Sequence, residues 1–449
     1  MIIKKYKFAL PIMVLVGVLY IILAWNMNIN GCPDEPMRLD LANWIAANGT
    51  LPTGYEYEII NPMWGYSYAF TPYLPSMIGG FFARIASIFT SNEHVLLFAV
   101  RLVSVISGLG AVFVSFRVGD KVYKNTAAVY FMACLVAFWP QVVFLSGYHN
   151  NDVPSLFFAF IVLDAMISGI KNDWNYKNMM YLSVGVSLVA LTYFFAYGWI
   201  LLAVTGFFYT ASKQGLKQRE IWSKAGIITL TVFVLAGWYF IRNGIIYNGD
   251  FLGMKQNDLC AALYEEQYNV HPVNWPGSYT TPFFQMLFER GWLKWTIESF
   301  IGLFGGLVIA LDKLFYAYYY FYFLACFLLF GIYVFKKQSK FKPVYILALV
   351  AMVLIPLGLS AYSSYMRDYS AQGRYIISSI PAIVLIMGEG MDKHSTMIKN
   401  KSEKLGKWFD FLAIFGWSIM FFVIVYWIML PTLCEIYLPG STFQIYHVR

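Results

Sequence analysis

The sequence predicts an all-α polytopic membrane protein with about eleven transmembrane helices, folded as a single integral membrane domain over residues 1–449. Two observations support this prediction. Hydrophobic residues make up 59% of the chain and charged residues only 12%, whereas a soluble domain carries about 25% charged residues. Lys and Arg also gather in alternate connections between apolar stretches, which is typical of chains that cross a membrane repeatedly.

Each predicted span is an apolar stretch close to the roughly 20 residues that cross a bilayer. The first span follows a lysine-rich start. Its apolar run from Phe8 to Trp25 is long for a signal peptide and no small-residue cleavage site follows it, so we expect a retained helix. The predicted spans are residues 8–27, 95–118, 125–146, 152–170, 178–193, 194–210, 225–247, 314–335, 343–361, 374–390 and 408–430.

The placement of charge predicts the sidedness of these spans. With the N-terminus in the cytoplasm, most of the 32 Lys and Arg residues fall in cytoplasmic loops, where membrane proteins retain them, and most of the 24 Asp and Glu residues fall outside. Topology thereby accounts for the net charge of +8, and no nucleic-acid partner is predicted. We expect a multi-pass protein of the cell (plasma) membrane whose chemistry takes place on the extracytoplasmic face.

Two large loops are predicted outside, at residues 28–94 and 248–313. The apolar stretch 68–89 lies within the first loop. Counting it as a span would place every later basic loop outside, and it contains Pro72, Pro75 and Arg84. We therefore interpret it as an interfacial helix. In the second loop, the segment 298–306 is expected to dip toward the membrane.

An acidic motif follows the first span, with Asp34 and Glu35 between two prolines. Adjacent carboxylates can accept a proton or bind a cation, so a divalent cation is one candidate ligand. The flanking prolines restrict the backbone around the pair. A solvated acidic turn is the alternative interpretation.

A second polar motif, Tyr148-His149-Asn150-Asn151-Asp152, lies in a short outer loop. Topology places it on the same side of the membrane as Asp34. Asp152 opens the following helix, so it could simply accept hydrogen bonds from the unpaired backbone N–H groups of the first turn. His149 is more readily explained as a loop histidine than as a ligand.

The third motif, Gln372-Gly373-Arg374, opens the tenth span on the outer face. The fork of an arginine side chain suits a phosphate group, to which it donates two parallel hydrogen bonds. Arg242, at the outer end of the seventh span, fits the same description, and both arginines could instead contact lipid headgroups. Asp164, inside the fourth span, is a weaker candidate.

Several motifs are absent. The sequence contains no HExxH, no GxxxxGK[ST], no GxSxG and no Asp-x-Asp, which disfavours a zinc protease, ATP-driven work, an acyl hydrolase and a metal–nucleotide sugar site. A transferase working outside, where nucleotides are scarce, would need a lipid-linked donor. The five cysteines include no CxxC; Cys32 and Cys260 are both predicted outside, where they could pair.

Taken in order, these motifs resemble the GT-C superfamily of membrane glycosyltransferases, in particular a bacterial branch related to protein O-mannosyltransferases. The segments that carry the resemblance are DEPMRLDLANWIAANGTLPTG, AFWPQVVFLSGYHNND, GWYFIRNGIIYNGDFLG, SFIGLFGG and QGRYIISSIPAIVL. They extend over most of the chain.

The resemblance implies a polyprenyl-phosphate sugar as donor and a glycan, glycolipid or protein as acceptor. It implies that Asp34 is the general base, with Glu35 as a neighbouring substitute. Substrate would be bound by Arg38, Asn151, Asp152, Arg242, Gln372 and Arg374. No metal ligand is assigned.

The sequence departs from the family pattern at two positions. Arg38 stands where related chains often have His, and Tyr193 stands where a lysine is expected. Arginine is neither a base nor a metal ligand, so Arg38 favours phosphate or sugar binding. The competing functions are a polysaccharide polymerase or ligase, a lipid-linked sugar transporter, and a non-catalytic scaffold. A transporter should show inverted repeats or helices broken near the middle of the bilayer.

Overall fold

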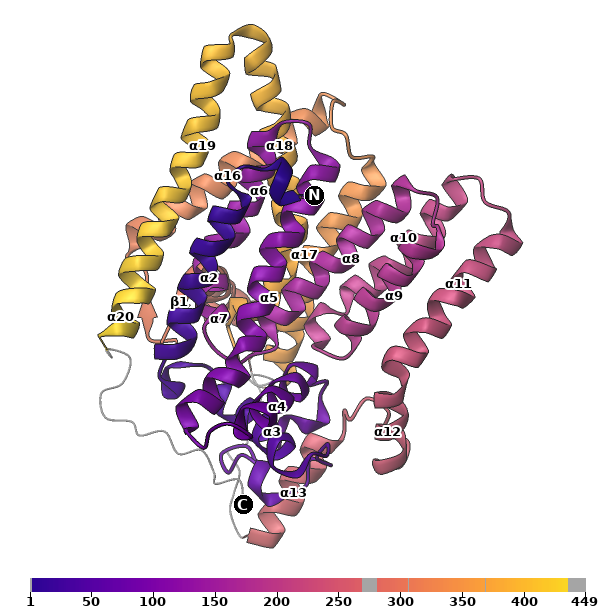
Figure 1. Ribbon diagram of the computed structural model, residues 1–449, viewed down its shortest axis with the longest axis vertical. Coiled ribbons are helices and arrows are strands. Elements are labelled where there is room, and N and C mark those ends of the chain that lie inside the picture. The colour runs from indigo at the N-terminus through magenta and orange to yellow at the C-terminus, as the bar shows by residue number, and fades with distance from the viewer. Residues whose placement is uncertain (1, 269–280, 306, 368, 435–449) are drawn as a thin grey trace.

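The computed structural model describes residues 2–268, 281–305, 307–367 and 369–434 (Figure 1). These residues form a bundle of helices with one small antiparallel hairpin, β1 (Leu303–Phe304) and β2 (Ile309–Ala310), in which Leu303 pairs with Ala310. The expectation of an all-α polytopic fold is confirmed.

Nine helical segments of the described chain are long and apolar enough to cross a membrane. The chain is therefore a multi-pass membrane protein. Four segments contain more than one helical type, because a 3-10 turn begins the segment or a π turn joins its two α-helices. The segments are α2 (Ala9–Asn26), α5 (Glu93–Val122), α8 (Asp152–Lys171), η4–α10 (Phe194–Ala196, Gly198–Lys213), α11–η5–α12 (Gln218–Val232, Phe233–Gly237, Trp238–Ile246), α16 (Lys313–Phe335), α17 (Pro343–Met366), η7–α18 (Gly373–Ser379, Ile380–Lys401) and α19–η8–α20 (Glu403–Ile424, Val425–Met429, Leu430–Leu433).

The other two predicted spans take less regular forms. Residues 125–146 form two helices, α6 (Thr126–Ala137) and α7 (Pro140–Ser146), bent by 53° rather than one straight helix. Pro140 starts α7 and cannot continue the hydrogen-bond ladder of α6, because it lacks an N–H group. The predicted span 178–193 is α9 (Tyr176–Ala190), whose 15 residues are fewer than a bilayer normally needs.

The first outer loop contains two short helices that pack together, α3 (Glu35–Asn48) and α4 (Leu74–Ser87), with 3-10 turns η1 (Ile29–Gly31), η2 (Tyr57–Ile59) and η3 (Tyr68–Phe70) around them. The 14 residues of α4 are too few to span a bilayer, which agrees with its interpretation as an interfacial helix. Gly80 permits the close packing, since a Cβ there would lie 2.7 Å from the Ala42 carbonyl oxygen.

The second outer loop contributes α13 (Gln256–Tyr268), α14 (Phe283–Phe288) and α15 (Trp292–Gly302); its residues 269–280 lie outside the described chain. The expected dip at 298–306 corresponds to the end of α15 and to β1, which pack against α7. Cys32 and Cys260, which the sequence allowed to pair, do not form a disulfide. Both thiols are free and buried, because Cys32 packs in the main core and Cys260 packs beside Phe70.

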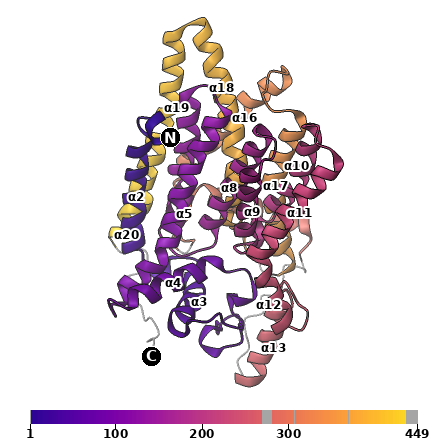
Figure 2. The ribbon, with the colours of Figure 1, turned by 45° about the vertical axis from the view of Figure 1, so that its right-hand side comes forward.

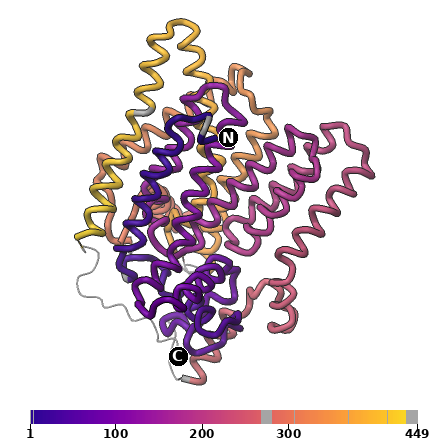
Figure 3. Tube along the Cα trace, viewed as in Figure 1, coloured from indigo at the N-terminus to yellow at the C-terminus, as the bar shows by residue number. Residues whose placement is uncertain are grey.

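The two ends of the bundle differ in what they contain. The N-terminus, α1 (Ile2–Lys5) and the α18–α19 turn lie at one end, whereas α3, α4 and α13 lie at the other (Figures 1 and 2). The basic stretch 391–407, predicted as a loop, is mostly helical because Ser402 caps α19 by accepting a hydrogen bond from Leu405 N. Figure 3 shows the first membrane-spanning helix, α2, beside the last helix of the described chain, α20.

The core lies along α5, α8 and η7–α18. The most apolar 18-residue windows of α8 and η7–α18 are 83% and 94% buried, whereas the outer helices expose wide apolar faces suited to lipid. Asp152 begins α8 and Gly373 begins η7. Two of the central helices therefore start close to the residues that the sequence singled out.

Candidate active site

Asp34 precedes α3 in an unusual backbone conformation. Its φ of 60° lies in the left-handed region, which Asp tolerates better than most residues. Its carboxylate makes no capping hydrogen bond to the helix. Instead it forms an ion pair with Arg374, whose Nη1 donates to the Pro33 carbonyl at 3.1 Å. The side chain stays 29% exposed, so Asp34 is neither an ordinary cap nor a freely solvated turn residue.

The charge of Asp34 is stabilised by its neighbours. Burial by itself would raise the pKa of this carboxyl, but Arg374 and then Arg38 outweigh burial and hold the pKa below its usual range, with a further contribution from the Tyr68 hydroxyl. Asp34 is therefore ionised at neutral pH.

Arg374 reaches Asp34 because η7 packs tightly against α15. A Cβ at Gly373 would lie 2.1 Å from Phe300 N, so only glycine permits this approach, and Gly373 N donates to Ser299 Oγ at 2.6 Å. Arg374 is buried, and its Nε has no partner within the described chain. The neighbouring Gln372 donates to Ser370 Oγ at 2.9 Å and leaves its own buried oxygen unpaired among the described residues.

Arg38 lies in the first turn of α3, and its charge acts on the Asp34 carboxylate that precedes the helix. Its guanidinium lies 4.9 Å from the Tyr68 ring centre and 5.8 Å from that of Tyr193. Such cation–π contacts stabilise a buried arginine. The two positions that depart from the family pattern, 38 and 193, are thus neighbours in space.

Asp152 does not act as the cap of α8. Asn150 takes that role, since its Oδ1 accepts from Asp152 N at 2.9 Å and from Val153 N at 3.0 Å. Both carboxylate oxygens of Asp152 are buried without a hydrogen-bond partner in the described chain, within electrostatic reach of Arg374 and Arg38. Asn151 donates to the Thr192 carbonyl at 2.9 Å, and its buried Oδ1 is likewise unpaired among the described residues.

Glu35 is fully buried and its contacts differ from those of Asp34. It forms a two-point ion pair with Arg101, at 2.8 Å to Nε and 2.6 Å to Nη2, and also accepts from His149 N at 2.7 Å. Arg101 Nη1 donates to the carbonyls of Ala24 and Met27. Glu35 therefore ties together α2, α3, α5 and the loop that carries Asp152, and its oxygens are committed to these contacts.

His149 extends this framework to α4. Its Nε2 lies 2.9 Å from Ser76 Oγ, which donates to the Arg38 carbonyl. Burial, reinforced by the charges of Arg38 and Arg101, lowers the pKa of His149 to about 3, so the imidazole is neutral. The sequence analysis did not identify Arg101 or Ser76. The position of Arg101 well inside the predicted span 95–118 was a usable signal, whereas nothing in the sequence distinguishes Ser76.

Two predicted candidates lie elsewhere. Arg242 donates to the carbonyls of Leu51, at 3.1 Å, and Pro52, at 2.6 Å, so it anchors the first outer loop and does not join Arg374. Asp164 is paired with Arg117 at 2.8 Å and with Lys121 at 2.6 Å. Local contacts therefore account for Asp164, whereas Arg242 also keeps a buried Nη1 without a partner in the described chain.

We call Asp34, Arg38, Asp152 and Arg374 the carboxylate–arginine cluster. Buried unpaired polar groups are rare in folded proteins and need an explanation. Several gather around this cluster, on Asp152, Asn151, Gln372, Arg38 and Arg374. The described residues contain no group of three or more His, Cys, Asp or Glu able to hold a metal ion, and two guanidinium groups lie beside the two carboxylates. The two guanidinium groups suit a polar, anionic ligand.

Comparison with known proteins identifies solved structures that share this fold. No protein-family model matches the chain, and no curated protein matches it in sequence. The oligosaccharyltransferase AglB from Archaeoglobus fulgidus, solved with an inhibitory peptide and a dolichol-phosphate, matches with a TM-score of 0.54 and 14% identity over 93% of this chain and 56% of that one. ArnT from Cupriavidus metallidurans, bound to undecaprenyl phosphate, matches with a TM-score of 0.53 and 13% identity over 95% of this chain and 73% of that one.

The chain therefore shares the fold of AglB and ArnT, which agrees with the fold that the resemblance to the GT-C superfamily implied. It spans little more than half the length of the archaeal oligosaccharyltransferase. The narrower likeness to the bacterial protein O-mannosyltransferase branch stays a prediction.

Proposed function

We propose that this protein is a glycosyltransferase that moves a sugar from a polyprenyl-phosphate donor to an acceptor hydroxyl on the extracytoplasmic face of the cell membrane. One observation carries the proposal: Asp34, Arg38, Asp152 and Arg374 come from three distant segments and meet at one end of a GT-C fold, with buried polar atoms left unpaired. The neighbouring structures that contain dolichol-phosphate and undecaprenyl phosphate support this donor class.

In the proposed reaction the acceptor oxygen attacks the anomeric carbon of the donor. A bond forms between these atoms while the bond from the anomeric carbon to the phosphate oxygen breaks, usually with inversion. Asp34 takes the acceptor proton as general base, and the polyprenyl phosphate leaves with the electron pair. Arg374 and Arg38 stabilise the negative charge that develops on the phosphate.

The ion pair between Asp34 and Arg374 implies that the donor binds before Asp34 becomes an effective base. In the free protein Arg374 suppresses the basicity of Asp34. A donor phosphate competes for the same guanidinium, because phosphate and carboxylate both accept its paired N–H groups. Donor binding would then release Asp34 and raise its pKa, so the base becomes effective only when the donor is present.

Two of the predicted site residues receive revised roles in this proposal. Glu35 has no free oxygen to replace Asp34, so we assign it a positioning role through Arg101 and His149. Arg242 is not assigned to the donor, because it is bound to the first outer loop. Asn151 and Gln372 each retain a buried oxygen that can accept from sugar hydroxyls.

No step of the proposed reaction passes through a metal ion. The carboxylates that could bind a divalent cation lie beside Arg374 and Arg38, which compete with it. Chelation with EDTA should therefore leave turnover unchanged. A loss of turnover that added Mg²⁺ or Mn²⁺ restores would overturn this part of the proposal.

The decisive experiment is turnover of a panel of radiolabelled polyprenyl-phosphate sugars by the purified protein in lipid nanodiscs. We expect wild type to consume one donor and Asp34→Asn to lose about 10²- to 10⁴-fold in rate, the usual contribution of a general base. Asp40→Asn is the matched control. It lies on the same helix outside the cluster, and burial raises its pKa to about 7, so it is partly neutral already.

Two results would contradict the proposal. Full activity in Asp34→Asn would remove the general-base role. Failure of folded wild type to consume any donor of the panel would exclude these monosaccharide donors and favour a polymerase or ligase, for which lipid-linked oligosaccharides are the substrates to test next.

A further inference from the structure

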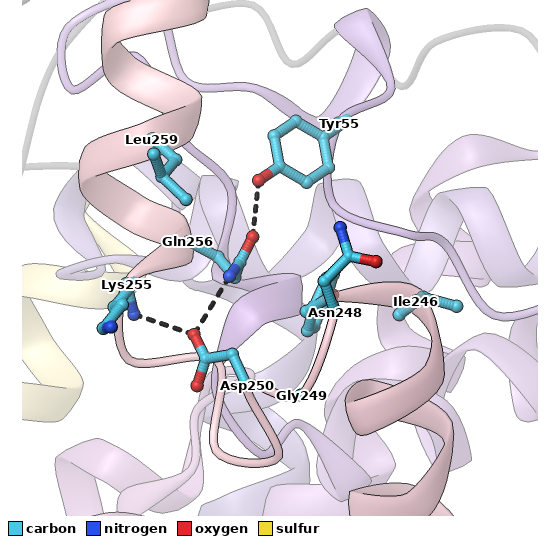
Figure 4. A pocket seen from close by; sticks show the side chains of 9 residues that line it. Tyr55, Ile246, Asn248, Gly249, Asp250, Lys255, Gln256 and Leu259 are labelled. Carbon is cyan, nitrogen blue, oxygen red and sulfur yellow. Dashed lines mark hydrogen bonds between the residues drawn. The ribbon is translucent and has the colours of Figure 1, made fainter.

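A pocket with a volume of about 580 Å³ lies apart from the carboxylate–arginine cluster (Figure 4). This volume lies within the range of small-ligand sites. Three segments form it: the first outer loop, the end of α12 with its following turn, and the start of α13. The lining residues are Tyr55, Ile246, Tyr247, Asn248, Gly249, Asp250, Lys255, Gln256 and Leu259.

The polar wall of this pocket is pre-organised. Tyr55 OH donates to Gln256 Oε1 at 2.6 Å, and Gln256 Nε2 donates to Asp250 Oδ2 at 3.0 Å. Asp250 is fixed in turn by the backbone N–H groups of Met254 and Lys255. Figure 4 shows this chain of hydrogen bonds running from Tyr55 through Gln256 to Asp250.

Other groups of the pocket are free to bind. The Asn248 amide and the Lys255 ammonium are exposed and make no hydrogen bond or ion pair within the described chain. Tyr55 leaves 37% of its surface exposed, which offers an aromatic face beside these groups. The set combines an aromatic ring, an amide, a carboxylate and one ammonium. These groups match the alternating C–H faces and hydroxyls of a sugar ring.

Aromatic contacts connect the lining of the pocket to the carboxylate–arginine cluster. Phe70 packs edge-on against Tyr55 at 5.1 Å and against Tyr247 at 5.7 Å. Phe70 belongs to η3, the same 3-10 turn as Tyr68, whose ring lies under Arg38. Gly253 allows α13 to approach this turn, since a Cβ there would lie 2.2 Å from the Phe70 carbonyl oxygen. One short turn therefore separates the two sites.

We propose that this pocket binds a sugar residue of the acceptor, so that the acceptor is a glycan chain rather than a peptide or a lipid; this inference rests on the proposed function. The single ammonium of Lys255 is poorly suited to a donor phosphate, for which the cluster supplies two guanidinium groups. A glycan long enough to pass η3 would present one end to Asp34 while an inner sugar occupies the pocket.

The test uses the full-length protein in nanodiscs and a panel of fluorescently labelled oligosaccharides of hexoses and N-acetylhexosamines. Binding is measured directly, and the KM values for donor and acceptor are measured separately. Tyr55→Ala removes the aromatic face, with Tyr55→Phe as its matched control. Asn248→Gly removes the amide and keeps the left-handed backbone at φ 50°. Lys255→Met removes the ammonium.

We expect wild type to bind one class of oligosaccharide. Tyr55→Ala should raise the acceptor KM by about tenfold or more, a change of about 1.4 kcal/mol, with the donor KM and kcat unchanged. Tyr55→Phe, Asn248→Gly and Lys255→Met should give smaller increases. Equal acceptor KM values in wild type, Tyr55→Ala and Asn248→Gly would overturn the proposal, as would parallel losses for donor and acceptor.

Failure of the proposed function would look different. If the protein binds an oligosaccharide through Tyr55 but consumes no donor, the pocket is a glycan site and the transferase proposal fails. If it consumes a donor with a peptide or lipid acceptor and binds no oligosaccharide, the pocket proposal fails and the transferase proposal stands.

Discussion

Two groups of carboxylates and cations, at opposite ends of the bundle, differ in how completely they are paired. At the end that holds the N-terminus, Asp164 is paired with Arg117 and Lys121, Asp392 with Lys340, and Asp410 with Lys399. In the carboxylate–arginine cluster, both oxygens of Asp152 and the Nε atoms of Arg38 and Arg374 have no partner among the described residues.

The difference distinguishes charged groups that stabilise the fold from charged groups that are available to a ligand. Leaving a buried polar group unpaired costs about 1–3 kcal/mol, and a charged group costs more. A fold that gives Asp164, Asp392 and Asp410 cation partners at one end therefore has the means to pair carboxylates at the other. Unpaired groups that persist at one site are explained when a ligand supplies the missing partners.

The largest expected effect comes from exchanging one carboxylate in each group for its neutral amide. Asp152→Asn should lower turnover by about 10²-fold or more, because it removes charge from the reacting centre, and should leave the melting temperature unchanged or raised. Asp164→Asn should keep turnover per folded molecule but lose about 1–3 kcal/mol of stability, since Arg117 and Lys121 lose their partner. Turnover and thermal melting are measured for both variants side by side. A stability loss in Asp152→Asn together with a turnover loss in Asp164→Asn would refute the different roles assigned to the two carboxylates.

The second prediction concerns Glu35. Both of its carboxylate oxygens are paired within the protein, whereas the carboxylate of its neighbour Asp34 stays partly exposed. Glu35→Gln or Arg101→Met should each cost about 3–5 kcal/mol, because each leaves a buried charge unpaired. The double variant should cost less than the sum of the two. Titration with a denaturing detergent measures these free energies. Strictly additive losses would mean that the pair does not act as a unit.

The third prediction is a shift in pH dependence. Arg374 lowers the Asp34 pKa, so the ion pair contributes stability above the ordinary pKa of an Asp, about 3.9, and this stability is lost as pH falls through the lowered value. The acid limb of kcat/KM, which reports the free protein, should lie below the ordinary range. Arg374→Ala should move that limb upward, because burial then dominates.

In wild type, the acid limb of the kcat profile should lie at higher pH than the acid limb of the kcat/KM profile. The kcat profile reports the donor complex, in which the donor phosphate occupies Arg374. Full pH profiles of wild type and Arg374→Ala test both statements. If the acid limbs of kcat and kcat/KM coincide in both proteins, the donor does not release Asp34 from Arg374 and this part of the proposal is wrong.

The smallest effect is expected at the cap of α8. Asn150→Ala should cost about 1–2 kcal/mol, because the N–H groups of Asp152 and Val153 lose their acceptor. The control is Asn151→Ala, which leaves this cap in place. Equal stability of Asn150→Ala and wild type in thermal melting would show that Asp152 itself can take over the cap.

Much of the fold could be predicted because the signals are local. The membrane class and the interfacial α4 follow from hydropathy and the distribution of Lys and Arg. Errors arose where local sequence does not fix geometry. Pro140 breaks a span that is mostly apolar, and the stretch 391–407 is charged yet mostly helical because it continues α18 and α19.

The candidate site was predicted in part. Asp34, Asp152 and Arg374 stood out because ionisable residues at the ends of apolar spans are uncommon. Arg242 stood out for the same reason, and the structure places it apart from the cluster, where it anchors a loop. The positioning residues Arg101 and Ser76 were missed, because their partners lie 66 and 38 positions or more away along the chain.

The sequence by itself determined that this chain crosses a membrane many times and gathers acidic and arginine motifs on one side, because hydrophobicity and charge act residue by residue. Only the tertiary structure decided the separate roles of Asp34 and Glu35. These neighbours meet different arginines, Arg374 and Arg101, from helices far apart in the chain. The same packing leaves Asp152 unpaired and forms the pocket beside Tyr55, since pairing and enclosure depend on which distant segments meet.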